Sequence, residues 1–563
     1  MSLQKYRWIL PAPVPFEIND QLRNYSSTMR SLLYQRGITT VRGAREFIST
    51  DPPPFSPSQT LTDLQQAADL VLTSVDEGKK IAVYGDYDAD GVTATALMVD
   101  GLNSLGAKVF PFLPHRIEDG YGLSSRAVER MIAEDFSLLI TVDCGIRAVD
   151  QVALAKQSGM NVILTDHHLP GDLLPEADAI INPNQRGDAY PNKNLAGVGV
   201  AYKLLKTIAE AEPKACADDA LDLVAIGTVA DIVPLTGENR WLVSRGLDRI
   251  NRTRRQGLRS LIAAAGLTPG TVQAADISYQ ISPRINSSGR MGSAKLALKL
   301  LLSDNIQEAG LLAQELEILN QRRKAETRST VKKAEALALQ EKGLPPVLFA
   351  FDESFHPGVV GIAASYLADR YFRPAVVGSR KNDLITASCR SIPDYNIIEA
   401  LSSHQELFDR YGGHASAAGF SIPVKHLSKL IESLSASAAE SLKAFPSKPE
   451  IKVDAEVELR DLKSQLLEEL SLLEPTGSQN PQAVLLSEDV KIIKKKVVGK
   501  NKSHLKLVVS DGSRKFDAIG FGLGHLNNDL PQSVDLVFAF EENIYRNRVS
   551  LQLRIHDLRP AAE

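Results

Sequence analysis

The chain has 563 residues, enough for about three to four domains, and 44% of them are hydrophobic and 23% charged. This composition excludes disordered, collagen-like and disulfide-scaffold classes, and the three widely spaced cysteines suggest no zinc site. With 64 basic against 68 acidic residues, any polyanionic partner must bind a local patch. Because neither a membrane span nor a signal-peptide pattern is visible, we expect a cytoplasmic protein with no membrane partner.

The first half of the chain is predicted to hold an N-terminal helical segment over 1–60 and a large α/β domain over 61–303. The helical segment ends at the prolines of DPPPFSP, residues 51–57. From Lys79 onward, apolar runs such as KKIAVYGD, FSLLITVDCG and MNVILTDHH each stop at Asp or Gly and give way to a helical stretch. This alternation predicts a parallel sheet covered on both faces, with ligands at the carboxyl ends of its strands.

The second half is predicted to contain three further parts. A proline-free stretch of strong helix formers indicates a long connecting helix over 304–344. A smaller α/β domain follows over 345–443. Short alternating strands then predict an all-β region within 444–563. The fold class is therefore multidomain α/β with a C-terminal all-β domain.

Three carboxylates, Asp86, Asp88 and Asp90, alternate directly after the first apolar strand of the large domain. Such a concentration of charge is tolerated when divalent cations neutralise it, because hard cations take oxygen ligands. An acidic turn that caps a helix is the alternative interpretation. An EF-hand is excluded because Leu97 stands where the loop needs its twelfth-position glutamate.

Further metal-ligand types follow the next elements of the same domain. Asp143 ends one strand, TDHH at Asp166, His167 and His168 ends another, and Asp231 closes an apolar helix-like run. Each of these residues, taken alone, could have a purely structural role as a helix cap or as a hydrogen-bonded residue of the core. Together they predict a mixed Asp/His site for two Mn²⁺ or Mg²⁺ ions, the arrangement that suits phosphoester hydrolysis.

The motifs YGDYDADG, VDCG, TDHH and GGHASAAG resemble the signatures of the DHH phosphoesterase superfamily. Within it, the chain is similar to the RecJ family of bacterial single-stranded-DNA-specific 5′→3′ exonucleases, and the likeness extends through IGTVADIVPLTGENR, SPRINSSGRM, GVVGIAAS and CRSIPDYNIIEAL. The resemblance implies a DHH catalytic domain, a DHHA1 substrate-binding domain and an OB-fold barrel. It also implies an enzyme that releases 5′ mononucleotides during DNA repair and recombination.

Roles for the acidic and histidine residues are carried over from this family. The resemblance implies that Asp143 bridges two ions, that Asp86 supports them and that His168 acts on the scissile phosphate. The other implied metal ligands are Asp88, Asp90, His167 and Asp231. Tyr84 departs from the pattern, because pyrophosphatase-like relatives place a ligating histidine there, which puts the first metal position in doubt.

Candidate phosphate-binding residues lie in the glycine-rich motif and among the arginines. Gly412 and Gly413 permit close backbone approach, and His414 adds a side-chain contact. Guanidinium groups match phosphate oxygens, so we also expect phosphate contacts from Arg116, Arg284, Arg290 and Arg390. Arg116 and Arg390 are the pair that we expect to receive the 5′ end.

The C-terminal region supplies local positive charge. The segment Lys491–Lys506 contains seven lysines and no acidic residue. A basic face on a small barrel is how OB-folds follow a single strand, although a solvated sheet face would show the same pattern. Phe516, Phe521 and Tyr545 are candidate base-stacking residues, with core packing as the alternative.

Two other functions compete with the exonuclease. A phosphodiesterase for very short or cyclic oligonucleotides would not need the basic barrel, and an inactive DNA-binding factor would not need intact metal ligands. Single-stranded DNA is the expected partner. A single-strand-binding protein and a helicase are further partners that the family role suggests.

Overall fold

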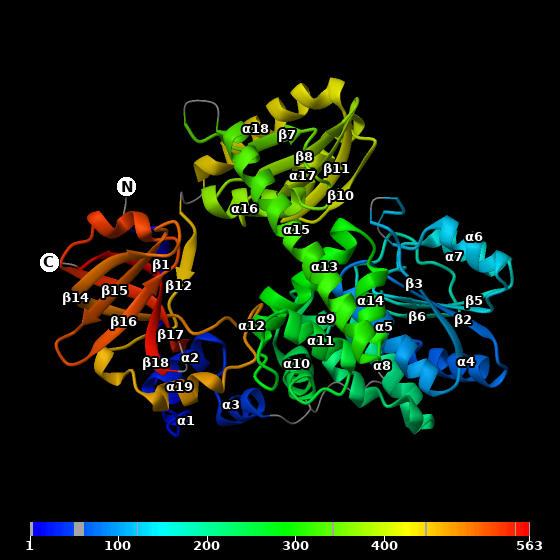
Figure 1. Ribbon diagram of the computed structural model, residues 1–563, viewed down its shortest axis with the longest axis horizontal. Helices are drawn as coiled ribbons and strands as arrows, with labels where there is room; N and C mark the ends of the chain where they lie inside the picture. Colours follow the sequence, from blue (N-terminus) through cyan, green and yellow to red (C-terminus); the bar gives the residue numbers. More distant parts are fainter. Residues whose placement is uncertain are drawn as a thin grey trace. The chain divides into compact units, whose positions relative to one another are not determined.

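The computed structural model describes residues 4–49, 61–116, 118–120, 122–339, 343–444, 448–545 and 548–561. The proline-rich boundary expected at 51–57 and the side chain of Tyr545 lie outside the described part. The chain forms two compact units, Met1–Asp51 with Pro446–Glu563, and Pro52–Phe445 (Figure 1). Among the described helices, none is both long and apolar enough to cross a membrane.

A five-stranded parallel sheet is the centre of the larger unit. Its strands are β2 (Lys80–Gly85), β3 (Lys108–Phe112), β4 (Leu138–Val142), β5 (Asn161–Thr165) and β6 (Ala179–Ile181), in the order β3-β2-β4-β5-β6. Alternate residues of one strand enter different cores: Ile81 and Val83 pack with α5 (Ala89–Ser104) and α8 (Gly197–Ala211), whereas Ala82 packs with α6 (Ser125–Ala133) and α7 (Val149–Gln157). The predicted parallel sheet with two covered faces is confirmed.

A layer of helices completes the domain and leads into the connecting helix. Its other described α-helices are α4 (Leu64–Asp76), α9 (Leu221–Ala230), α10 (Gly237–Ile250), α11 (Gln256–Ala264), α12 (Ala274–Asp276), α13 (Ser282–Met291) and α14 (Lys295–Leu302), and a π-helix (Ile277–Ile281) joins α12 to α13. The expected connecting helix is α15 (Ile306–Ala338), which is 33 residues long. It follows α14 directly and reaches the smaller α/β domain, where it packs against α16 (Val360–Tyr371) (Figure 1).

The smaller α/β domain has a mixed sheet. Its strands are β7 (Leu348–Asp352), β8 (Ala375–Lys381), β9 (Leu384–Arg390), β10 (Arg410–Gly413) and β11 (Ala417–Pro423), in the order β10-β11-β9-β8-β7. Among the described strands of this sheet, only β7 and β8 pair in parallel. Helix α16 covers one face, and α17 (Ile397–Ser402) and α18 (Leu427–Ala444) cover the other.

The smaller unit contains the predicted all-β domain, which is a closed barrel. Strands β14 (Leu485–Val498), β15 (His504–Ser510), β16 (Lys515–Gly520), β18 (Arg548–Pro560) and β17 (Ser533–Tyr545) follow one another, and β17 pairs back onto β14. Short β12 (Glu450–Lys452), β13 (Ala455–Glu456) and α19 (Ser464–Ser471) precede the barrel. Closure leaves none of these five strands as a free edge over its whole length.

The N-terminal segment folds together with this barrel. It contains α1 (Phe16–Gln21), α2 (Ser27–Gln35) and α3 (Val41–Ile48), but also β1 (Arg7–Ile9), which pairs in parallel with β12. The indole nitrogen of Trp8 donates to the buried carboxylate of Asp557 over 2.7 Å. Helix α2 packs its apolar face against Leu473 after α19. The two ends of the chain therefore share one core.

Candidate metal centre and substrate cleft

The loop between β2 and α5 holds three carboxylates in fixed positions. The side chain of Asp88 caps α5 by accepting from the backbone nitrogens of Asp90 (3.0 Å) and Gly91 (3.1 Å). A side chain at Gly91 would lie 2.5 Å from the backbone nitrogen of Asp86, so only glycine fits there. The carboxylate of Asp90 is buried and accepts from the first turn of α8, at Gly197 (2.7 Å) and at the next residue.

Asp143 follows β4 in a left-handed backbone conformation, with φ at 60°. Aspartate tolerates this conformation better than most residues, and strained positions of this kind are frequent at functional sites. A Cβ at Gly197 would stand 2.4 Å from the Cβ of Asp143, so α8 approaches the aspartate through a glycine. Oδ1 of Asp143 lies 3.1 Å from Nε2 of His167, and Oδ2 of Asp231 lies 3.7 Å from the same nitrogen.

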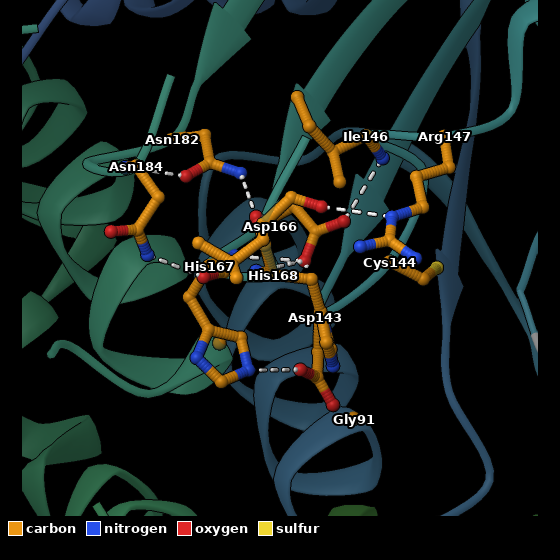
Figure 2. A network of polar contacts seen from close by, with 12 residues as sticks. Gly91, Asp143, Cys144, Ile146, Arg147, Asp166, His167, His168, Asn182 and Asn184 are labelled. Carbon is orange, nitrogen blue, oxygen red and sulfur yellow. Dashed lines mark hydrogen bonds and ion pairs between the residues drawn. The ribbon is translucent and has the colours of Figure 1, made fainter. Parts of the chain in front are cut away.

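Asp166 organises the two histidines after β5. Its Oδ1 accepts from the backbone nitrogens of His167 (2.7 Å) and His168 (3.1 Å) and lies 2.7 Å from Nδ1 of His168. Its Oδ2 accepts from the backbone nitrogen of Ile146. Figure 2 shows Asp166 within this network and the ring of His167 turned toward Asp143. The two imidazoles are thus held in different directions, one toward the acidic cluster and one on Asp166.

The carboxylates of the cluster resist ionisation. Burial and then Asp88 raise the pKa of Asp86 to about 8 and that of Asp231 to about 7. Burial and the neighbouring aspartates also raise the pKa values of Asp90 and Asp143 well above the usual range. Such shifts mean that this arrangement of like charges is unfavourable without a compensating cation.

The histidines have opposite protonation preferences. Burial and the charge of His168 lower the pKa of His167 to about 4, so its imidazole is neutral, the form that ligates metals. Burial also opposes protonation of His168, but the hydrogen bond to Asp166 and the nearby carboxylates outweigh it and raise the pKa of His168. Despite its burial, Asp166 has a lowered pKa because His168 stabilises its ionised form.

The cluster fits divalent cations. Three buried atoms of the cluster have no hydrogen-bond partner: Oδ1 of Asp86, Oδ1 of Asp143 and Nε2 of His167. The last two atoms lie 3.1 Å apart, but their geometry is too poor for a hydrogen bond. Ligand atoms lie within 4.8 Å of one another in three overlapping groups: Asp143, His167 and His168; Asp90, His167 and Asp231; Asp86, Asp88 and Asp143. Shared members suit two adjacent ions with oxygen and imidazole ligands. The hydroxyl of Tyr84 donates to the carbonyl of Gly122 instead of joining the cluster.

An arginine group lies beside the acidic loop. Burial and the charges of Arg116 and Arg323 lower the pKa of Arg290 to about 10. Arg290 donates to the carbonyl of Gly358 in the smaller α/β domain (3.1 Å), and the guanidinium of Arg116 lies 4.9 Å from the ring of Tyr87. The pKa of Arg390 is also lowered, by burial and by Arg116. The planar donors of guanidinium groups match phosphate oxygens, so an anion placed among these arginines would relieve their mutual repulsion.

A cavity of about 790 Å³ extends from His168 to the glycine-rich motif. Its walls include His168, Leu169, Arg147, Arg390 and the Gly412–Gly419 turn. At Gly413, φ is 145° and a Cβ would meet the carbonyl oxygen of Ala417 at 2.4 Å, so the turn requires glycine. Because residues of the large α/β domain and of the glycine-rich motif line one cavity, a single ligand can touch both.

Not every expected phosphate-binding residue lies at this cavity. Arg390, Gly412, Gly413 and His414 line it, and Arg116 and Arg290 belong to the neighbouring arginine group. Arg284 is instead buried and paired with Glu317 of α15 at 2.7 Å. Its charge is already compensated, so we assign it a structural role in place of the expected phosphate contact.

Sequence reasoning missed three contributors to the site, Asn182, Asn184 and Arg323. It also missed the hydrogen bonds of Asp166, a residue that was visible within TDHH. Asn182 and Asn184 donate to the backbone carbonyls of His168 (2.9 Å) and His167 (2.7 Å). Arg323 adds charge beside Arg290. None of these has a spacing signal, because each acts through a contact across the fold.

The barrel carries the expected basic surface. Among the described residues, Lys506 is the one lysine of the segment with an acidic partner, Asp517 at 2.7 Å. The side chains of Lys494, Lys495 and Lys496 are exposed in β14, directly after its bulge between Ile492 and Lys494. Phe516 is buried against Phe540, which settles its role as core packing. Phe521 is 61% exposed and lies with its ring centroid 5.2 Å from that of His504.

Comparisons with known proteins match all three folded regions. Family models match at 80–228 (DHH family, N-terminal domain), 344–440 (DHHA1 domain) and 453–557 (RecJ OB domain). The single-stranded-DNA-specific exonuclease RecJ of Bacillus subtilis (strain 168) is 36% identical over 563 residues, which cover 99% of this chain and 71% of the relative.

Two solved structures of RecJ from Thermus thermophilus resemble the whole chain. The complex with Mn²⁺ has a TM-score of 0.85 at 32% identity and covers 99% of this chain and 80% of that chain. The complex with Mg²⁺ has a TM-score of 0.79 at 30% identity, with coverages of 99% and 79%.

Proposed function

The chain belongs to the RecJ family of single-stranded-DNA-specific exonucleases, and from this premise we infer that it removes 5′ mononucleotides successively from single-stranded DNA. It is a metal-dependent phosphodiester hydrolase of DNA repair and recombination. One observation carries this conclusion. A cluster of mutually repelling aspartates with two histidines and a partly buried group of arginines lie together in one compact unit.

Mn²⁺ or Mg²⁺ is the cofactor, as in the Thermus relatives. We assign Asp88, Asp90, Asp143, His167 and Asp231 as the residues that would hold two ions, with Asp143 shared and Asp86 supporting them. When bound, the ions supply positive charge to the phosphate and lower the pKa of an attacking water. The neutral imidazole of His167 favours Mn²⁺ somewhat over Mg²⁺.

His168 is the residue that we assign to the scissile phosphate. Burial opposes protonation of His168, but its hydrogen bond to Asp166 raises its pKa above the ordinary value, which favours the protonated imidazole. Because Asp166 holds Nδ1, Nε2 is the nitrogen that would stabilise charge on the phosphate or protonate the departing oxygen. Asp166 thereby acts as a positioning residue for His168.

The 5′ end would bind where the arginines meet the glycine-rich turn. Arg116, Arg290 and Arg390 would neutralise the 5′ phosphate, and Gly412–His414 would hold the first nucleotide against the cavity wall. A partly buried arginine recognises phosphate strongly because its planar donors match two oxygens at once. The 790 Å³ cavity has room for one nucleotide.

The basic face of the barrel would guide the rest of the strand. Lys494, Lys495 and Lys496 would follow the backbone, and Phe521 would stack on a base. We expect replacement of the three lysines by alanine to weaken binding of a long oligonucleotide, measured by fluorescence anisotropy. The slope of the logarithm of the binding constant against the logarithm of salt concentration should fall in magnitude by about 2–3. Unchanged slopes would remove the barrel face from the DNA path.

We propose that 1–60, 61–303, 304–344, 345–443 and 444–563 are the functional parts of the chain, with the described residues of the first sharing a core with the last. A single-strand-binding protein and a helicase are the partners that would present single strands to such an enzyme. Because its substrate is DNA, we propose that the protein acts in the cytoplasm.

The test is the product distribution from a 5′-labelled single-stranded oligonucleotide with Mn²⁺. We expect labelled mononucleotide from the first time point, no product with Asp143→Ala, and no product from a blunt duplex. A descending ladder of labelled products would contradict the 5′→3′ direction and favour the short-oligonucleotide class. Binding without cleavage would favour an inactive DNA-binding factor.

A further inference from the structure

Ile232 occupies an unfavourable position at the edge of the acidic cluster. It follows Asp231 at the end of α9, with φ at 60°, and its side chain is 73% exposed. Helices commonly end in this left-handed conformation, but usually with glycine or asparagine, because other side chains strain the backbone. An isoleucine at this position costs free energy for two reasons: its backbone is strained, and its apolar side chain is exposed to water.

The fold itself needs the turn but not the side chain. The backbone nitrogen of Ile232 bonds to the carbonyl of Val229 at 3.3 Å, a contact that glycine would also make. Among the described non-glycine residues with left-handed φ, Ile232 is the one with a β-branched side chain; most of the others are Asp, Asn, Gln or Lys. Strain retained next to a functional group points to a role for the side chain that bears it.

The place of Ile232 beside the acidic cluster indicates that its side chain contacts the substrate. Consecutive Cα atoms are about 3.8 Å apart, so Ile232 lies next to Asp231, whose carboxylate is 3.7 Å from His167. Among the described residues that line the 790 Å³ cavity, neither Asp231 nor Ile232 is present. If that cavity takes the 5′ nucleotide, Ile232 lies outside the 5′-nucleotide site but directly beside the acidic cluster.

We propose that Ile232 is a positioning residue that packs against the apolar face of the nucleotide following the scissile phosphate. A single strand presents the unpaired base and the C–H face of its deoxyribose, surfaces that an exposed aliphatic group can cover. The contact holds the phosphate over the acidic cluster and keeps bulk water away from one side. This inference rests on the proposed function and adds a subsite to it.

The test uses a substitution whose structural and functional effects have opposite signs. Ile232→Gly removes the side chain and also relieves the strain, so the melting temperature should stay equal or rise by about 1–3 °C. The KM for a single-stranded oligonucleotide should rise about 5- to 20-fold, the value expected for losing most of one buried aliphatic side chain. kcat should stay within about twofold, because the contact is made in both the ground and transition states.

Two further variants serve as controls. Ile232→Leu keeps an apolar side chain and should restore the KM to within about threefold of wild type. Ile306→Ala removes an equally exposed isoleucine, 71% exposed at the start of α15, and should leave the KM unchanged.

Three outcomes would overturn the proposal. A KM for Ile232→Gly within twofold of an active wild type would refute the nucleotide contact. A lower melting temperature together with lower kcat would show a structural role instead. A wild type that cleaves no single-stranded DNA with Mn²⁺ would overturn the proposed function, and this subsite with it.

Discussion

Asp86 should make the metal-free protein less stable as the pH rises. Burial and Asp88 raise the pKa of Asp86 from its ordinary value of 3.8 to about 8. A carboxyl group with a raised pKa binds its proton more tightly in the folded than in the unfolded chain. Stability is therefore lost between the unfolded pKa and about pH 8, the reverse of an aspartate in a salt bridge.

The size of the effect follows from the shift. A difference of about 4 pKa units corresponds to at most about 6 kcal/mol, at about 1.4 kcal/mol per unit. The neighbouring aspartates share this repulsion and relax with it, so we expect Asp86→Asn to recover about 2–3 kcal/mol at pH 8 and less at pH 5. Asparagine has nearly the same shape, so the substitution creates no cavity.

Unfolding of chelator-treated protein at pH 5 and pH 8 measures this directly. Asp86→Asn should unfold several degrees above wild type at pH 8 without metal and below it in excess Mn²⁺, because wild type gains more from binding the ion. Asp172→Asn, which removes an exposed carboxylate, is the matched control and should change neither transition. The reasoning is refuted if Asp86→Asn loses stability with pH as steeply as wild type, or if Mn²⁺ stabilises both equally.

Three other substitutions test separate parts of the site. Asp166→Asn removes the negative charge that raises the pKa of His168, so the alkaline limb of the kcat profile should move to lower pH and kcat at pH 8 should fall about 10²- to 10⁴-fold. An unshifted profile would contradict the role of Asp166. Gly197→Ala places a methyl group against Asp143 and should reduce Mn²⁺ affinity at least tenfold by calorimetric titration, whereas normal affinity would mean that α8 can move aside. Arg390→Ala should raise the KM about tenfold for 5′-phosphorylated DNA and less for 5′-hydroxyl DNA; equal KM values for the variant and wild type would exclude Arg390 from the 5′ pocket.

The sequence alone determined the elements whose signals are local. Continuous apolar runs predicted buried parallel strands, and the structure confirms the sheet and the long helix α15. The motifs of Asp86, Asp143 and His167 were equally readable, because each follows its strand directly, whereas Asp231 follows helix α9. Parallel strands end at one edge, so Asp86, Asp143 and His167 were brought together by topology that the sequence already indicated.

Only the tertiary structure decided which of two similar residues belongs to the site and which to the core. Arg284 and Arg290 lie on one helix, yet one pairs with Glu317 and the other joins the arginine group. Phe516 and Phe521 lie five residues apart, yet one is core and the other exposed. In each pair the neighbours come from distant parts of the chain, and no local spacing records them.

The N-terminal strand and Ile232 show the same limit at the level of the backbone. β1 pairs with β12 more than 440 residues away, a contact that helical propensity in the first segment could not reveal. The left-handed φ of Ile232 contradicts the usual preference of a β-branched residue. Local sequence sets which backbone conformations are favourable, whereas long-range packing decides where an unfavourable one is kept.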